Sequence, residues 1–462
     1  MRNSLVGSGV ESSVIRLRLS GPVAVDPSSP LDWRLQVWLL SSLFFNMPFF
    51  CVYGAGFWME WPLPQYSVIL VVVALFVAGV FFLMPALAVH AARKSLFETL
   101  ADSIGSLPAL GVRLCGIALL FLWIGGLFGV SLNLVSSAMD LWDSPLSRGL
   151  VCVATLCFLC FTGVQSEANS AKLAFLSAKF GLAILIAGLV RVHEAWPAIP
   201  YGFQHSGISS DGMDIWRRLS ELVAYLAPLC FFAAAWGPRT SGRKQIVAAA
   251  LLGLALPLLA VLLLLGVMNV ATAKSAYYQP SLDPNITMAL WGQTARSAIP
   301  GRMLIVSVTV FGVVRFGIRA LADSAALFST GRVTRWLMVG AFIAVSTVLS
   351  MHAFDPTAFP TRTATTHVLV VASAILTADW LLKHSKPEGH GRWDWAGCTA
   401  LGAGLAAPWY LPAMLVGSGD DVWWYRSLLP SYGMTLLACV IGRAVERAVV
   451  ARHRNPPGLV SP

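Results

Sequence analysis

Long apolar stretches separated by short polar connections recur along the whole chain. A membrane-spanning helix needs about 20 mostly apolar residues. Twelve segments reach that length, centred near Phe45, Leu75, Leu122, Leu156, Ile184, Phe231, Leu258, Phe311, Ala344, Ala372, Ala403 and Leu437. The pattern therefore predicts an all-α membrane protein with about 12 transmembrane helices.

The positively charged residues indicate how these helices are oriented. With the N-terminus in the cytosol, 19 Lys and Arg residues fall on the inner side and 9 on the outer side. Cytoplasmic loops of membrane proteins carry this excess, so we expect a multi-pass protein of the inner (cytoplasmic) membrane. An even number of spans places both termini in the cytosol. The first thirty residues contain no apolar run typical of a signal peptide and are expected to form a cytosolic tail.

The composition indicates that the chain lies in the lipid bilayer and disfavours several other classes of partner. Hydrophobic residues make up 57% of the chain and charged residues 12%, against about 25% charged residues in typical soluble domains. The net charge of +10 comes from Lys and Arg residues in the loops between the apolar segments. Because these residues do not form basic patches interleaved with aromatics, we expect no nucleic-acid partner. The sequence has no Walker-type phosphate loop, so we do not expect ATP-driven transport by this chain alone. Cys157 and Cys160 lie within an apolar run, where we expect them to pack as small apolar side chains. Neither a metal nor a cofactor is expected.

Helix-breaking residues occur near the middle of the first and sixth apolar segments. The first segment contains Asn46–Pro48, and the sixth contains Leu226–Pro228 and ends at Trp236–Pro238. Proline removes a helical hydrogen bond and exposes carbonyls that lipid cannot satisfy. Each break alone is also consistent with a simple proline kink. Together, in the first and sixth of twelve spans, they predict a five-plus-five inverted repeat, as found in secondary transporters.

The expected organisation follows from this repeat. Residues 1–33 would form the cytosolic N-terminal tail, and residues 34–190 the first repeat with helices one to five. Residues 191–383 would form the second repeat with helices six to ten. Residues 384–449 would add helices eleven and twelve, and residues 450–462 a cytosolic tail.

Four patches carry a family resemblance. They are Lys94–Gly105 with the helix that follows it, Leu122–Gly126, Pro238–Gln245 and Ala374–Leu382. In these patches and in layout the chain resembles the nucleobase–cation symporter-1 family (cytosine, purine, allantoin and hydantoin permeases). That family belongs to the amino acid–polyamine–organocation superfamily. The resemblance implies the leucine-transporter-type fold with two additional C-terminal helices, and a permease activity.

Departures from the family pattern affect the expected substrate and coupling ion. Leu127 stands where the family motif has Gln, four residues after Trp123, and the acidic residue expected near Trp236 is absent. On helix eight, only Ser307 and Thr309 remain as hydroxyl ligands for sodium. These differences favour proton-coupled or sodium-independent transport of a solute other than an ordinary nucleobase.

Charged residues inside predicted helices are candidate coupling residues, because a charge at the bilayer centre costs about 2.5–3.5 kcal/mol on insertion scales. Arg315, Arg319 and Asp323 form one stripe on helix eight. At about 1.5 Å per residue, Arg319 lies about 26 Å deep and Asp379 of helix ten about 24 Å deep. We therefore predict an Arg319–Asp379 ion pair, with a coupling role or a packing role.

Lys179 on helix five lies at a depth similar to that of Arg315. In the fold implied by the resemblance, helices five and eight flank a sodium site against helix one. A fixed cation there would replace the metal ion, and lysine can lose its proton when desolvated, which suits proton coupling. The alternative is a side chain that extends toward the membrane interface.

The candidate site residues fall into two groups. The predicted substrate-binding residues lie near the helix breaks or supply aromatic faces: Asn46, Met47, Trp123, Leu127, Phe231, Trp236 and Arg315. The predicted ion-site or coupling residues are Lys179, Ser307, Thr309, Arg319 and Asp379. As in the family, Trp123 would stack on a planar ring, with Phe231, Phe232 and Trp236 on the opposing side.

Three classes of function remain open. The first is secondary transport of a small nucleobase-like, planar or anionic solute, or of an amino acid or organic anion. The second, an integral-membrane enzyme, is disfavoured because the eight His residues are dispersed without an H-x-x-x-H pair. The third is a transporter-fold sensor that binds without flux. The sequence does not indicate an oligomeric state.

Overall fold

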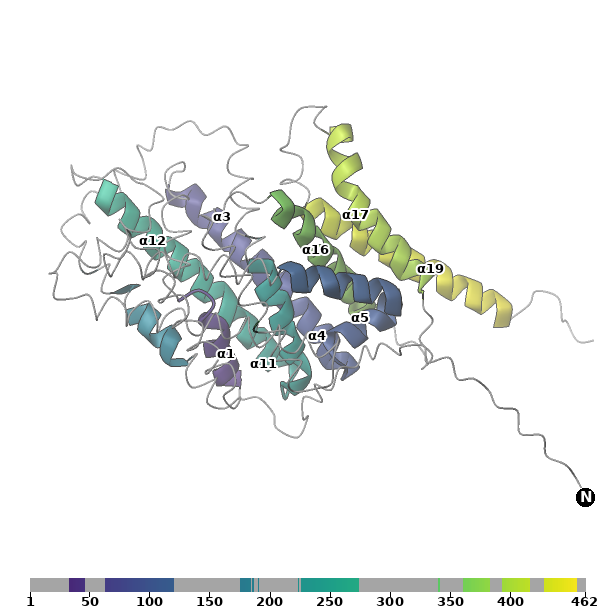
Figure 1. The fold of residues 1–462 in the computed structure, drawn as a ribbon, viewed down its shortest axis with the longest axis horizontal. Coiled ribbons are helices and arrows are strands. Elements are labelled where there is room, and N and C mark those ends of the chain that lie inside the picture. Colours follow the sequence, from purple (N-terminus) through teal and green to yellow (C-terminus); the bar gives the residue numbers. More distant parts are fainter. Residues whose placement is uncertain are drawn as a thin grey trace, which may run out of the picture.

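The described part of the chain is helical throughout. The computed structural model describes residues 33–45, 63–119, 175–183, 185–186, 190, 223, 226–273, 340, 360–382, 393–415 and 428–454. Helices pack along one another in the view of Figure 1. On one side, α16 (Pro360–Leu381), α17 (Trp395–Leu415) and α19 (Leu428–Arg454), the predicted helices ten to twelve, are in mutual contact. The predicted spans centred near Leu156, Phe311 and Ala344 lie outside the described residues, so the number of helices stays a prediction.

Helix one changes from an α-helix to a turn shortly before the residues at which the sequence analysis expected a break. α1 (Trp33–Ser41) ends at Ser41 and continues into a turn over residues 42–45. In that turn, Leu43 donates to the carbonyl of Leu40 at 3.0 Å and Phe44 to that of Ser41 at 3.0 Å, a tighter spacing than the α-helix has. Phe45 also donates to the carbonyl of Ser41, at 3.1 Å, with the α-helical spacing. Asn46–Pro48 lie beyond the described residues.

Helix two is a continuous helix with a widened segment in its course. It consists of α3 (Leu63–Phe76), the π-helix η1 (Val77–Leu83) and α4 (Met84–Ala92). Helix seven repeats this arrangement with α11 (Arg243–Ala248), the π-helix η4 (Ala249–Ala255) and α12 (Leu256–Ala273). η1 and η4 contact each other, and π-helical turns often occur at functional sites. The second helix of each predicted repeat therefore carries a π-helical segment.

Each π-helical segment presents a carbonyl to a serine of a neighbouring helix. The hydroxyl of Ser373 on α16 donates to the carbonyl of Val80 in η1. The hydroxyl of Ser41, at the end of α1, lies 3.4 Å from the carbonyl of Gly253 in η4 and also donates to Val37 at 2.8 Å. The two segments thereby connect helices two and seven to helices ten and one.

Helix six changes from an α-helix to a 3₁₀-helix near the end that the sequence analysis expected for it. Residues 226–233 are α-helical through Pro228, and the change occurs at the 3₁₀-helix η3 (Ala234–Arg239). Pro238 explains the position, because its ring clashes with the carbonyl of Ala234 and it disfavours the α conformation at Gly237. This change agrees with the predicted end of the sixth segment at Trp236–Pro238. The turn before Pro228, where a break was also predicted, includes residues outside the described part of the chain, so that break stays a prediction.

A short helix connects helix two to helix three. α5 (Leu96–Ile104) begins with a capping box, in which Ser95 and Glu98 satisfy each other's backbone N–H groups. It ends at Gly105, whose φ of 94° suits glycine. The next helix, Ser106–Leu119, begins directly afterwards.

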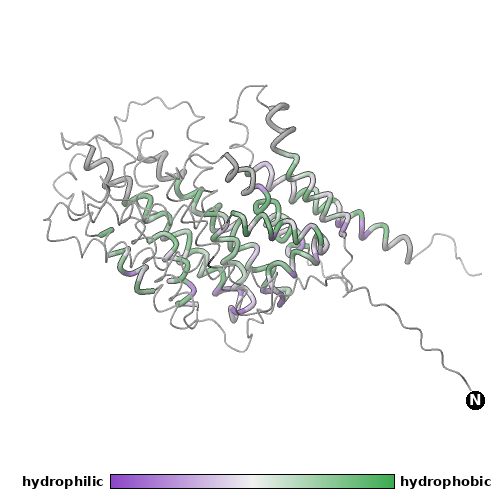
Figure 2. The backbone as a smooth tube through the Cα atoms, viewed as in Figure 1, coloured by the Kyte–Doolittle hydropathy of each residue, from purple (hydrophilic) through white to green (hydrophobic). Residues whose placement is uncertain are grey.

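The C-terminal helices are α16 (Pro360–Leu381), α17 (Trp395–Leu415) and α19 (Leu428–Arg454). Among the described residues, Leu70–Ala92 and Arg243–Leu264 are long and apolar enough to cross a membrane, by length and composition. Apolar residues cover most of the described helices in Figure 2. Large apolar side chains such as Val72, Leu256 and Ile441 are more than half exposed, as expected for helix faces that contact lipid.

Candidate functional site

Helix five packs directly against helix one at the turn that follows α1. A Cβ atom built at Gly181 would overlap the backbone carbonyl oxygen of Phe45. Phe45 is the last described residue of the turn that follows α1, and its side chain is buried. Only glycine permits this approach of the two backbones.

Lys179 lies two residues earlier on helix five and contacts α1 through an aromatic ring. Its ammonium is 4.1 Å from the ring centroid of Phe175 and 5.8 Å from that of Trp38. The two rings meet edge to face, with centroids 5.1 Å apart. A cation over aromatic faces is stabilised by the ring quadrupole. The side chain of Lys179 is exposed, and its role at an ion site stays a prediction.

The aromatic residues predicted to face substrate on helix six have protein partners. Phe231 and Phe232 are buried, and their ring centroids lie 6.5 Å and 5.8 Å from that of Phe97 on α5. Trp236 is half-buried in η3, and its carbonyl accepts from Thr240 at 3.2 Å. Contact with α5 accounts for Phe231 and Phe232 without a ligand, so substrate binding by these residues stays a prediction.

Eight candidate residues lie outside the described part of the chain. They are Asn46, Met47, Trp123, Leu127, Ser307, Thr309, Arg315 and Arg319. The expected closeness of the breaks in helices one and six, beside Trp123 and Arg315, is therefore untested.

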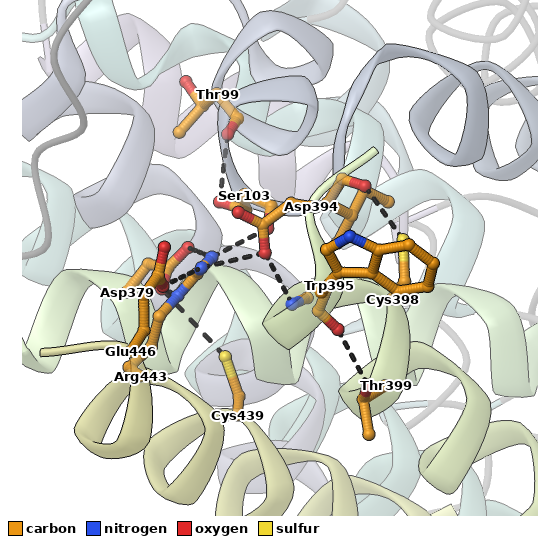
Figure 3. A network of polar contacts seen from close by, with 12 residues as sticks. Thr99, Ser103, Asp379, Asp394, Trp395, Cys398, Thr399, Cys439, Arg443 and Glu446 are labelled. Atoms are coloured by element: carbon orange, nitrogen blue, oxygen red, sulfur yellow. Dashed lines mark hydrogen bonds and ion pairs between the residues drawn. The ribbon is translucent and has the colours of Figure 1, made fainter. Parts of the chain in front are cut away.

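Asp379 forms an ion pair with Arg443 of α19, a residue that the sequence analysis did not name as a candidate. Arg443 Nε donates to Asp379 Oδ1 at 3.0 Å and Nη2 to Oδ2 at 3.2 Å (Figure 3). The Arg443 side chain is 0% exposed and that of Asp379 is 11% exposed. The predicted partner, Arg319, lies outside the described residues, and that pairing stays a prediction.

Arg443 also binds three further groups, two from other segments and one from α19 itself. Nη1 donates to Asp394 Oδ1 at 2.8 Å and to Glu446 Oε2 at 3.1 Å. Nη2 donates to the carbonyl of Ser103, at the end of α5, at 2.7 Å. A guanidinium has five N–H donors, and here each one has an acceptor. We call Arg443, Asp379, Asp394, Glu446 and the Ser103 carbonyl the Arg443 cluster (Figure 3).

Asp394 links the Arg443 cluster to the start of α17. Its Oδ1 accepts from the backbone N–H of Gly397 at 2.7 Å, as an N-cap residue does. Its own N–H donates to the carbonyl of Ile104 at 3.2 Å, and the thiol of Cys398 donates to the same carbonyl at 3.2 Å. The ends of α5 and α17 are therefore joined by backbone and side-chain hydrogen bonds.

Further polar contacts hold the last turns of α16. The hydroxyl of Tyr432 on α19 donates to that of Thr377 at 3.0 Å. Arg447, one turn after Arg443, donates to the carbonyl of Leu382 at 2.8 Å. With Ser373–Val80 and Asp379–Arg443, four side-chain interactions secure α16 from Ser373 onward. Within the described ranges, no group of three or more His, Cys, Asp or Glu residues could hold a metal ion.

Comparisons with known proteins identify the fold of this chain. No family model and no curated protein sequence matches the chain. A structure of Mhp1, a nucleobase-cation-symport-1 family transporter in a closed conformation with bromovinylhydantoin bound, matches with a TM-score of 0.67. The match covers 91% of this chain and 95% of that chain at 12% identity. The chain has the leucine-transporter-type fold.

Two other solved structures share this fold. A Na⁺-coupled sialic acid symporter matches with a TM-score of 0.58 and 10% identity over 89% of each chain. MhsT in complex with L-phenylalanine matches with a TM-score of 0.54 and 12% identity, over 90% of this chain and 99% of that chain. The leucine-transporter-type fold predicted from the broken helices and the family resemblance is thus confirmed. The likeness to Mhp1 agrees with the family that the sequence patches resemble.

Proposed function

We propose that this protein is a secondary active transporter that carries a small solute across the cytoplasmic membrane, with both termini in the cytosol. The observation that carries the proposal is the fold shared with transporters, in which helix five approaches the backbone of the turn after α1 at Gly181. Unwound backbone inside a membrane is tolerated where it lines a cavity or binds a ligand. Discontinuous helices of this kind form the substrate sites of secondary transporters.

The proposed substrate is a planar, nucleobase-like or anionic compound. The Mhp1 structure contains bromovinylhydantoin, and Trp123 would stack on a planar ring in this chain. Asn46, Met47, Leu127 and Arg315 are proposed to surround the same site. An amino acid is the second candidate, because MhsT binds L-phenylalanine in the same fold.

The proposed coupling is independent of sodium. Lys179 extends from helix five toward α1, with its ammonium near the ring of Trp38. A cation held near the turn after α1 would supply the positive charge that a bound sodium ion supplies in sodium-coupled transporters. Ser307 and Thr309 are the only hydroxyl ligands that we assign to the ion site.

We expect uptake by this transporter to be unchanged when choline replaces sodium. A thermal-shift screen of the purified protein against nucleobases, hydantoins, amino acids and organic anions first identifies a ligand. Uptake of that ligand into proteoliposomes is then measured in sodium and in choline, with and without an imposed pH gradient. A strict, saturable sodium requirement would contradict sodium independence, and binding without flux would favour the sensor.

A further inference from the structure

Helix seven has an exposed apolar face that ends in exposed cations. Val247 in α11, Leu251 in η4 and Leu256 at the start of α12 are between 38% and 55% exposed. The N–H of Leu256 donates to the carbonyl of Leu251, the five-residue spacing of a π-helix, which places these two residues on one face. Arg243 and Lys244 are exposed one turn before Val247. One face of helix seven therefore joins apolar side chains to two positive charges.

The cations at this end of helix seven have no anionic partner in the part of the chain that the structure describes. Arg243 and Lys244 form no ion pair there, and neither does Arg93, which follows the last residue of α4 and is also exposed. α4 and α11 contact each other and lie close together in Figure 1. Exposed positive charges therefore meet from two neighbouring helix ends.

The acidic side chains of the adjoining helix and helix seven itself leave these charges unbalanced. On α5, which contacts α4, Asp102 pairs with Lys94 at 2.9 Å. Glu98 of the same helix accepts from the N–H and the hydroxyl of Ser95. The first turn of α11 contains no acidic residue, and the positive end of a helix dipole disfavours cations in that turn. An anion from outside the chain would therefore offset the positive charge.

We propose that this face binds an anionic phospholipid. Its headgroup contacts Arg243, Lys244 and Arg93, and an acyl chain lies along Val247 and the exposed leucines of helix seven. The cations are on the side that we expect to face the cytosol, where anionic headgroups attract Lys and Arg near a helix end. A zwitterionic lipid fits less well, because its own amine neutralises the phosphate. This inference names a lipid partner and does not depend on which solute is carried.

The test compares the binding of phosphatidylglycerol and phosphatidylcholine to the purified full-length protein. Each lipid is titrated into detergent-solubilised protein, and bound lipid is counted by native mass spectrometry. We expect phosphatidylglycerol to bind more tightly. Arg243→Gln/Lys244→Gln should weaken phosphatidylglycerol binding by about 25-fold, since each cation near an anionic headgroup contributes about fivefold. Arg93→Gln alone should weaken it about fivefold by the same reasoning, and phosphatidylcholine binding should not change.

Arg447→Gln is the matched control, because Arg447 is also exposed but donates to the carbonyl of Leu382. This variant should bind phosphatidylglycerol as the wild type does. The substituted residues are exposed, and an unchanged unfolding temperature in phosphatidylcholine confirms that each variant folds. If the double variant does not fold, Arg93→Gln and Lys244→Gln decide singly, each with the same fivefold loss expected.

The position of the lipid is tested with a phosphatidylglycerol that carries a photoreactive group in its acyl chain. It should label residues 247–256 in the wild type and label them less in Arg243→Gln/Lys244→Gln. Equal affinity for the two lipids, or an equal loss per charge in Arg447→Gln, overturns the proposal. Labelling elsewhere only also overturns it. Displacement of the lipid by an equal concentration of free glycerol phosphate would show that the acyl chain contributes nothing, and overturns the assignment to a lipid.

Discussion

Replacing Arg443 with methionine should lower the free energy of unfolding by about 3–5 kcal/mol, the usual effect of breaking a buried ion pair by removing one partner. Methionine preserves most of the side-chain length but has no donor. Asp379 and Asp394 would then be left inside the protein without this guanidinium, and the carbonyl of Ser103 would lose its side-chain donor. Thermal or denaturant unfolding of the detergent-purified protein measures the change.

Arg447→Met is the matched control for this prediction. Arg447 lies one turn further along α19, is exposed and donates one hydrogen bond, to the carbonyl of Leu382. We expect a loss of about 1 kcal/mol or less, the net value of a single hydrogen bond. Equal losses for Arg443→Met and Arg447→Met would show that the Arg443 cluster contributes no more than a surface contact.

The second large effect is expected from Gly181→Ala. The new methyl group would overlap the backbone carbonyl of Phe45, which cannot rotate away as a flexible side chain would. Overpacking of this kind costs about 1–3 kcal/mol. If the unwound segment of helix one absorbs that strain, ligand affinity should fall by about ten- to a hundredfold, since 1.4 kcal/mol corresponds to a factor of ten. Isothermal titration with the ligand from the thermal-shift screen measures the change.

Gly402→Ala on α17 is the control for the added methyl group. A Cβ at Gly402 would meet no heavy atom within 4 Å. Replacing a helical glycine by alanine at such a position is neutral or stabilising by up to about 1 kcal/mol, so binding should be unchanged. Wild-type affinity in Gly181→Ala would contradict a ligand site next to Phe45.

The fold could be predicted from local sequence signals more readily than the contacts between helices. Proline interrupts a helix within the nearest turns of the backbone, so its positions in the first and sixth segments predicted a five-plus-five repeat. The predicted end of helix six at Trp236–Pro238 agrees with η3 (Ala234–Arg239). The breaks at Asn46–Pro48 and in the turn before Pro228 fall on residues outside the described part of the chain and stay predictions.

The Arg443 cluster was missed because depth along a helix does not specify neighbours across the membrane. The depth estimate matched Asp379 with Arg319 but contained no information on which helices are adjacent. The spacing of Arg443 and Glu446 by three residues, together with Asp394 directly before an apolar helix, was an available signal. The π-helical segments had no comparable signal, because the hydrophobic pattern of a short π-helix resembles that of an α-helix.

The Arg443 cluster also has a consequence for biosynthesis. Arg443 lies 340 residues after Ser103, so α5 is synthesised and inserted long before the side chain that secures its end. Until α19 enters the membrane, Asp379 and Asp394 lack the guanidinium that accompanies them in the finished protein. The last helix therefore completes attachments made by segments from both halves of the chain. A nascent chain that stops before Arg443 would keep Asp379 and Asp394 without their cationic partner.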